Sequence, residues 1–198
     1  MRLVLASRNA HKVRELGALL RPHELIPLPD GVELPPEAGE TFIENAATKA
    51  RAAARATGRP ALADDSGIEA AALGGAPGVR SARFAGERAT DEENLAKLLR
   101  DVPADGDRSL AYVCALAVAV AAPPGAESEL EVALFEERCE GLLTHEPRGT
   151  GGFGYDPAFV PHDPGDGRTM AELTREEKDA VSHRGRAARA LIEWLGRS

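Results

Sequence analysis

Two adjacent carboxylates, Asp64 and Asp65, follow a short apolar run in the segment PALADDSG. Carboxylate oxygens are the ligands that Mg²⁺ prefers, and a positioned carboxylate can also act as a general base. Because side chains alternate along a strand, the two aspartates cannot face one pocket unless the strand has ended. We therefore expect them to have different roles, with Ser66 and Gly67 forming a turn after the strand. The role of Asp64 is open between a structural acid and a further metal ligand.

Two glutamates are further candidates for a metal site, and each has a structural alternative. Glu44 stands three residues after Thr41, which is the spacing of a helix capping box. Glu37 lies in the loop LPPEAG, where a solvated surface acid is the alternative to a metal ligand.

Lysine is rare in this chain, because only four of its 24 basic residues are lysines: Lys12, Lys49, Lys97 and Lys178. On a helical wheel Lys49 falls inside the apolar stripe of its own helix, so we expect a buried anionic partner rather than a solvated amine. Lys97 is expected on an exposed helix face. A chance effect of an arginine-rich composition is the alternative explanation for the scarcity.

Cations also stand at three predicted helix starts, although the helix dipole favours anions there. Lys12 follows an Asn9 cap, Lys178 follows a capping box that begins at Thr174, and Arg184 follows a Ser182 cap together with His183. Helix N-termini with nearby cations are a common phosphate site, so the three starts predict a shared anion.

A glycine-rich segment, GTGGFGYDP, occupies residues 149–157. Its glycines allow the backbone to approach a ligand closely, and Phe153 and Tyr155 are expected to sandwich a planar base. Such a loop is weak evidence by itself, because turns between strands look similar. The chain has no phosphate-loop motif.

The composition limits the class of protein. The chain has 198 residues and a formal net charge of −8, which argues against an extended nucleic-acid-binding face. The absence of an apolar run of about 20 residues argues against a membrane protein, and the short apolar start is expected to be a first strand, so we expect a cytoplasmic protein. Cys114 and Cys139 are expected to be buried and reduced.

The hydrophobic pattern predicts an α/β domain with a mixed sheet. The C-terminal part is expected to be helical, and the loop APPGAES is expected to join the two longest strands. The predicted strands are 2–6, 25–28, 61–65, 110–121, 130–139 and 158–160, and the other predicted helices are 9–20 (with Val13, Leu16 and Leu20 on one face), 41–57 and 90–100.

Five segments, in this order, resemble the inosine triphosphate pyrophosphatase-like family, which acts on non-standard purine nucleotides. They are LASRNAHKVREL, TFIENAATKA, ADDSG followed by LGGAPGVRSARFAGE, GTGGFGYDP, and AELTREEKDAVSHRGRA. The resemblance implies a single domain over residues 1–198, elongated and two-lobed, with a central mixed sheet flanked by helices and an active-site cleft between the lobes. It also implies a homodimer that hydrolyses ITP, dITP and XTP to the monophosphate and pyrophosphate with Mg²⁺.

The resemblance further implies the site residues. Asp65 matches the catalytic acid and, with Glu37, a metal ligand. The positions that match substrate-binding residues are Ser7, Arg8, Asn9, Ala10, His11, Lys12, Lys49, Ser66, Phe153, Gly154, Tyr155, Asp156, Lys178, His183 and Arg184.

We hypothesise that Phe153 stacks on the base while Arg184, Lys178 or His183 donates to its 6-oxo group. A related pyrophosphatase of the Maf-like group, which acts on pyrimidine or modified triphosphates, is the nearest alternative. A nucleotide sensor without turnover and a nucleic-acid-binding module are two further alternatives, and both fit the residues less well.

Overall fold

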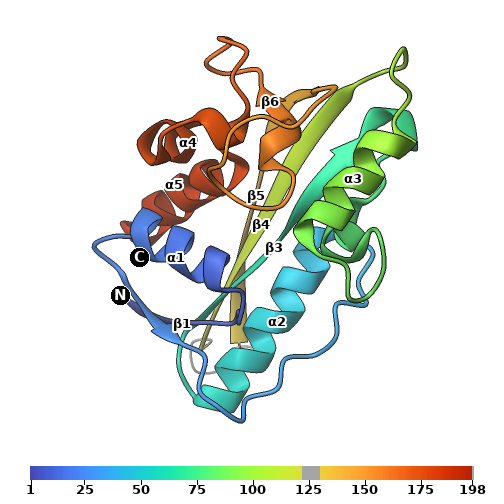
Figure 1. Cartoon of the computed structure of the whole chain (residues 1–198). Helices are drawn as coiled ribbons and strands as arrows, with labels where there is room; N and C mark the ends of the chain where they lie inside the picture. Colours follow the sequence, from blue (N-terminus) through green and yellow to red (C-terminus); the bar gives the residue numbers. More distant parts are fainter. Residues whose placement is uncertain (122–129, 198) are drawn as a thin grey trace. The chain divides into compact units, whose positions relative to one another are not determined.

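The computed structural model describes residues 1–121 and 130–197. The predicted APPGAES loop lies outside these residues. The described strands form one six-stranded sheet in the order β2-β1-β3-β4-β5-β6 (Figure 1). Strand β1 is parallel to β2 and to β3, whereas β5 and β6 are antiparallel. The predicted α/β class with a mixed sheet is therefore confirmed.

The element bounds agree with most of the predicted ranges. The strands are β1 (Arg2–Leu5), β2 (Glu24–Pro27), β3 (Ala61–Ala70), β4 (Ser109–Ala121), β5 (Leu130–Leu143) and β6 (Phe159–Pro161). The α-helices are α1 (Ala10–Leu19), α2 (Phe42–Thr57), α3 (Asp91–Asp101), α4 (Arg175–Val181) and α5 (His183–Leu195). Four short 3-10 helices, η1 (Ala71–Leu73), η2 (Gly78–Arg83), η3 (Asp156–Ala158) and η4 (Met170–Glu172), complete the described elements.

The extent of β3 corrects the sequence analysis. The strand does not end at Asp65 but continues to Ala70, so Ser66 and Gly67 lie inside it rather than in a turn. Nearly all of its side chains are buried, which is possible because both faces of this strand are covered. The apolar run that marked the strand is therefore shorter than the strand itself.

Local sequence signals explain why α2 begins and ends where it does. The hydroxyl of Thr41 accepts a hydrogen bond from the Glu44 amide, and the Glu44 carboxylate accepts one from the Thr41 amide, as predicted. Gly58 ends the helix in the left-handed conformation, with φ of 63°. The buried stripe of α2 consists mainly of alanines, so the helix backbone can pack closely.

The chain divides into two compact units, and each has its own hydrophobic core. The first unit comprises Met1–Asp65, Cys114–Glu136 and Ala187–Ser198, and the second comprises Ser66–Val113 and Glu137–Arg186. The core of the first unit is built from β1, α1, the start of β3, the middle of β4 and the later turns of α5; it includes Leu3, Leu16, Leu62, Leu116 and Leu191. The core of the second unit includes Ile68, Leu98, Tyr112, Phe159 and Met170.

One side chain of the predicted apolar face of α1 is not part of the core. Leu16 and Leu20 are fully buried, but Val13 is 36% exposed. Among the described residues, no helix combines the length and the apolar character that crossing a bilayer requires.

Candidate active site

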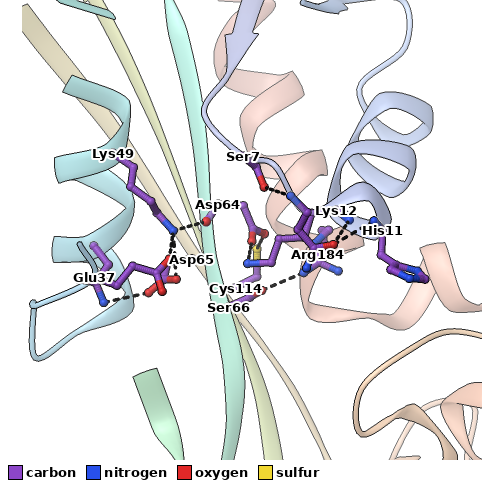
Figure 2. A network of polar contacts seen from close by, with 12 residues as sticks. Ser7, His11, Lys12, Glu37, Lys49, Asp64, Asp65, Ser66, Cys114 and Arg184 are labelled. Carbon is purple, nitrogen blue, oxygen red and sulfur yellow. Dashed lines mark hydrogen bonds and ion pairs between the residues drawn. The ribbon is translucent and has the colours of Figure 1, made fainter. Parts of the chain in front are cut away.

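The neighbouring aspartates of β3 point to opposite faces of the sheet, and each contacts a lysine from a different helix (Figure 2). Lys12 of α1 forms an ion pair with Asp64. Lys49 of α2 lies 3.2 Å from an oxygen of Asp65. Because β3 continues through both residues, its two-residue periodicity separates the side chains. The two acids therefore have different partners, and their different roles stay a prediction.

Asp65 belongs to a buried cluster in the first unit. The Lys49 ammonium donates to Asp65 Oδ1, to the Asp64 carbonyl at 2.9 Å and to the Glu37 carboxylate. Asn45 donates its amide to Asp65 Oδ2 at 3.0 Å. Asp65 is 4% exposed and Lys49 is 7% exposed. The predicted buried anionic partner of Lys49 is therefore confirmed in Asp65, and the half-buried Glu37 is a second carboxylate partner.

The charges in this cluster shift one another's pKa values. Burial raises the pKa of Asp65 to about 6; Lys49 opposes this shift, and the nearby Glu37 carboxylate adds to it. Burial would lower the pKa of Lys49, but Asp65 and Glu37 outweigh that effect and raise it. Burial also acts to raise the pKa of Glu37, but Lys49 outweighs this effect and lowers it. The cluster thus holds one carboxylate that changes charge near neutral pH beside one that stays ionised.

Sequence reasoning missed Asn45, although a signal for it was present. Asn45 stands four residues before Lys49 on α2, so the two side chains share the buried face of the helix. Its side-chain oxygen accepts the Gly39 amide at 2.8 Å, which ties the loop containing Glu37 to the start of α2. A Cβ at Gly39 would lie 2.8 Å from that same oxygen, so a side chain there would disturb the contact.

Asp64 has different partners on the other face. It is 1% exposed and pairs with Lys12, and the Cys114 thiol donates to its Oδ2 at 3.3 Å. Cys114 and Cys139 are both buried and free, as predicted. The contact between Cys114 and Asp64 was not predicted.

The loop before α1 provides the other predicted phosphate-side residues. Asn9 caps the helix as expected, because its side-chain oxygen accepts the amides of His11 and Lys12 at 2.9 and 3.2 Å. Ser7 accepts the Asn9 amide at 3.2 Å, and Arg8 donates to the Val32 carbonyl at 3.0 Å. Arg8, Asn9, Ala10 and His11 are exposed. This loop therefore has an accessible surface, whereas Lys49 and Asp65 are buried.

The second unit contains another charged group, centred on Asp156. The Asp156 carboxylate accepts from Lys178 Nζ at 2.7 Å, from the Phe153 amide at 2.9 Å and from the Tyr112 hydroxyl at 3.1 Å. Gly152 has φ of 71°, and a Cβ there would lie 2.0 Å from an Asp156 oxygen. This position therefore requires glycine for the loop to close over Asp156.

Two cations lie over the ring of Phe153. Lys178 Nζ is 5.3 Å and Arg184 Cζ is 5.7 Å from the ring centroid. Arg184 also donates to the Ser66 hydroxyl at 2.8 Å. The structure thus brings Phe153, Lys178, Arg184 and Ser66 together in the second unit, and Gly154 is next to Phe153 in the chain.

Tyr155 does not offer a face for the predicted aromatic sandwich, because its ring is buried in a hydrophobic core. Tyr155 is 6% exposed, packs in the core of the second unit and donates its hydroxyl to the Ser81 carbonyl at 2.7 Å. The apolar body of a tyrosine is favourable in a core when its hydroxyl finds an acceptor.

The three helix-start cations all have partners within the protein. Lys12 pairs with Asp64, Lys178 with Asp156, and Arg184 with Ser66. The interpretation of Lys178 as an unfavourable cation at a helix start is wrong. Helix α4 is only seven residues long, and Lys178 lies in its last turn, where the dipole favours a cation. A shared anion stays a prediction.

The carboxylate oxygens of Glu37 and Asp65 in the first unit are of the kind that binds Mg²⁺. Glu37 and Asp65 converge on one cationic group, the Lys49 ammonium, and both supply hard oxygen ligands. No cluster of three or more histidine, cysteine or acidic residues suited to a metal occurs among residues 1–121 and 130–197. Mg²⁺ commonly uses one or two carboxylates and completes its shell with water and substrate phosphates, so two are sufficient.

The fold is α/β, and its third strand carries two aspartates that each form an ion pair with a lysine. These residues form a charged candidate site. The model described as "Ham1 family" matches residues 3–194, so the chain belongs to the Ham1 family.

Curated relatives and solved structures are similar over nearly the whole chain. A dITP/XTP pyrophosphatase of Shigella flexneri is 50% identical over 98% of both chains, and one of Streptomyces coelicolor is 49% identical over 96% of this chain and 95% of its own. A HAM1 protein of Coxiella burnetii has a TM-score of 0.86 and 43% identity over the full length of both chains. A nucleoside-triphosphatase / dITP/XTP pyrophosphatase of Mycobacterium abscessus has a TM-score of 0.73 and 43% identity over 97% of this chain and 99% of its own.

Proposed function

We propose that this protein is a nucleoside triphosphate pyrophosphatase that hydrolyses dITP, XTP and ITP to the monophosphate and pyrophosphate, and so removes altered purines from the nucleotide pool. The activity is supported by the names of the relatives, which match this chain at about half of all positions along nearly its full length. The observation that carries the proposal is the buried cluster of Glu37, Asp65 and Lys49, which is suited to water activation beside a polyphosphate.

Asp65 is proposed as the catalytic acid. A water oxygen forms a bond to the α-phosphorus while the bond from that phosphorus to the α–β bridging oxygen breaks, and pyrophosphate leaves. Asp65 accepts the proton of the water, and a pKa of about 6 suits a general base that works near neutral pH. Asn45 and Lys49 hold the carboxylate in position.

Mg²⁺ is proposed as the cofactor, held by Glu37 and Asp65. When bound, the ion would neutralise phosphate charge and lower the pKa of bound water. Lys12 and the loop from Ser7 to His11 are proposed to bind the phosphates, with Lys12 stabilising negative charge on the leaving group.

The base is proposed to bind at the second charged group. Phe153 offers an aromatic face, and Lys178, His183 and Arg184 are donors for a 6-oxo group, while Ser66, Gly154, Tyr155 and Asp156 complete this side. A site rich in donors discriminates against adenine, whose 6-amino group leaves those donors unpaired.

A substrate panel tests the activity. Pyrophosphate release would be measured from dITP, XTP, ITP, GTP, ATP and dTTP, each with Mg²⁺ and with EDTA. We expect turnover of the first three with Mg²⁺ only. ³¹P NMR of the products separates pyrophosphate plus monophosphate from phosphate plus diphosphate. Equal turnover of ATP or dTTP, or release of inorganic phosphate as the first product, contradicts the proposal.

A homodimer is proposed as the working assembly, on the family resemblance. Light scattering after size-exclusion chromatography should give about twice the chain mass of 20.9 kDa. A mass of one chain at the concentration of the assay contradicts it.

A further inference from the structure

A buried tyrosine contacts two groups that the proposed function assigns to the base side. Tyr112 lies on β4 and is 7% exposed. Its hydroxyl donates to Asp156 Oδ1 at 3.1 Å. Its ring stacks face to face on the His183 imidazole, with centroids 4.4 Å apart and planes inclined by 3°. One side chain thus touches both an acid and a histidine of the predicted site.

The hydroxyl of Tyr112 determines the direction of the Asp156 carboxylate. Asp156 Oδ1 accepts from Tyr112, while Oδ2 accepts from Lys178 Nζ and from the Phe153 amide. A carboxylate held at one oxygen cannot rotate freely, so Oδ2 stays directed at both other donors. The position of the Lys178 ammonium and of the Phe153 backbone therefore depends on a bond made by Tyr112.

The ring of Tyr112 is itself fixed. Phe159 meets it edge to face, with centroids 4.8 Å apart and planes inclined by 63°. His183, which begins α5 and is 4% exposed, lies against the ring. Aromatic contacts of this kind are favourable beyond the burial of area, so the ring restrains the imidazole plane.

We propose that Tyr112 is a positioning residue for purine recognition: its hydroxyl orients Asp156, and through it Lys178 and Phe153, while its ring orients His183. The inference rests on the proposed function, because it names the residue that prepares that site for a 6-oxopurine. Burial and the charge of Asp156 raise the pKa of Tyr112 well above its ordinary value, so the hydroxyl remains a donor across the assay range.

Two substitutions separate the two contacts. Tyr112→Phe removes the hydroxyl and keeps the ring, whereas Tyr112→Leu removes both. KM and kcat would be measured with dITP, and the dissociation constant would be measured with inosine monophosphate by titration calorimetry. For Tyr112→Phe we expect KM and the dissociation constant to rise about tenfold with kcat within about twofold, because the lost bond supports binding rather than the chemical step. Tyr112→Leu is expected to raise both constants further.

Ser81→Ala is the matched control. Ser81 is a buried hydroxyl of the same unit, 5% exposed, which accepts the Ile68 amide at 2.8 Å and donates to the Gly78 carbonyl at 2.6 Å. Its side chain is not part of the proposed site. Thermal unfolding of all variants would be recorded, and Ser81→Ala is expected to lose stability as Tyr112→Phe does while keeping the wild-type KM.

The outcomes separate this inference from the proposed function. If Tyr112→Phe keeps the wild-type KM and dissociation constant, the inference is overturned. It is also overturned if Ser81→Ala raises KM as much as Tyr112→Phe does, because the effect is then one of stability. A wild-type chain that binds inosine monophosphate without hydrolysing dITP overturns the proposed function alone, and weaker binding by Tyr112→Phe then still supports the inference. A wild-type chain that neither binds nor hydrolyses overturns both.

Discussion

Asp64 and Asp65 are joined by one peptide bond, yet they have different surroundings. Asp64 pairs with Lys12 and accepts from a thiol, whereas Asp65 shares Lys49 with a second carboxylate, Glu37. The pKa of Asp65 is raised to about 6 by burial and by that neighbour. Strand alternation can therefore give two identical side chains different chemistry, because each one meets the helix that covers its own face.

The largest effect is expected from removing the charge of Asp65. Asp65→Asn should lower kcat for dITP by about 10³-fold, which lies within the range of a lost general base. The chain should remain folded, because asparagine keeps the shape and can still accept from Lys49. Steady-state pyrophosphate release measures the loss, and circular dichroism checks the fold. Turnover close to that of the wild type would remove Asp65 from the catalytic role.

Removing the partner of Asp64 should lower stability, in addition to its effect on the proposed phosphate binding. Lys12→Met leaves a fully buried carboxylate without its cation, so the free energy of unfolding should fall by about 3 kcal/mol. Adding Asp64→Asn to Lys12→Met should recover part of the loss, because the uncompensated charge is then absent. Urea unfolding at pH 7.5 measures both. Wild-type stability of Lys12→Met would mean that the ion pair is not maintained in solution.

The raised pKa of Asp65 predicts a pH dependence of stability without metal. The folded chain binds a proton at Asp65 near pH 6, whereas the ordinary pKa is 3.8. Between these values the folded state holds more protons than the unfolded state, so the contribution of this group to stability falls as the pH rises. Above pH 6 the ionised form destabilises the fold, and Asp65→Asn should then be more stable than the wild type by on the order of 1 kcal/mol.

Urea unfolding in EDTA from pH 4 to pH 8 tests this pH dependence. The difference between Asp65→Asn and the wild type should disappear towards pH 4. Glu37→Gln removes one cause of the raised pKa of Asp65, so in that background the stability difference should be smaller and should stop growing at a lower pH. A difference that does not change with pH would contradict the assigned titration.

The smallest effect on the free energy of unfolding is expected at an exposed ion pair. This pair is a reference for the buried pairs of Lys12 with Asp64 and of Lys49 with Asp65. Arg2 and Glu24 lie 2.9 Å apart, and both side chains are more than half exposed. Water and salt screen such a pair, so Arg2→Met should change the free energy of unfolding by less than about 0.5 kcal/mol. A change as large as that of Lys12→Met would mean that burial is not what separates the pairs.

Most of the fold could be predicted from the sequence, because the signals for its elements are local. The Thr41 and Thr174 capping boxes join residues three positions apart, and both form as expected. The position of Lys49 in an apolar stripe likewise follows from helical periodicity, and it predicted the buried carboxylate partners. The end of β3 could not be predicted, because Ser66 and Gly67 have turn-like composition and only burial on both faces keeps them in the strand.

The partners of the site residues are the part that the tertiary structure decided. Tyr112 meets Asp156 across 44 positions, and Cys114 meets Asp64 across 50. Nothing near Tyr112 or Cys114 in the chain marks them, since both read as core residues of an apolar strand. By itself the sequence determined where the helices and most strands lie and which residues carry charge. Which charge meets which partner depends on the packing of distant segments, and local residue preferences do not encode it.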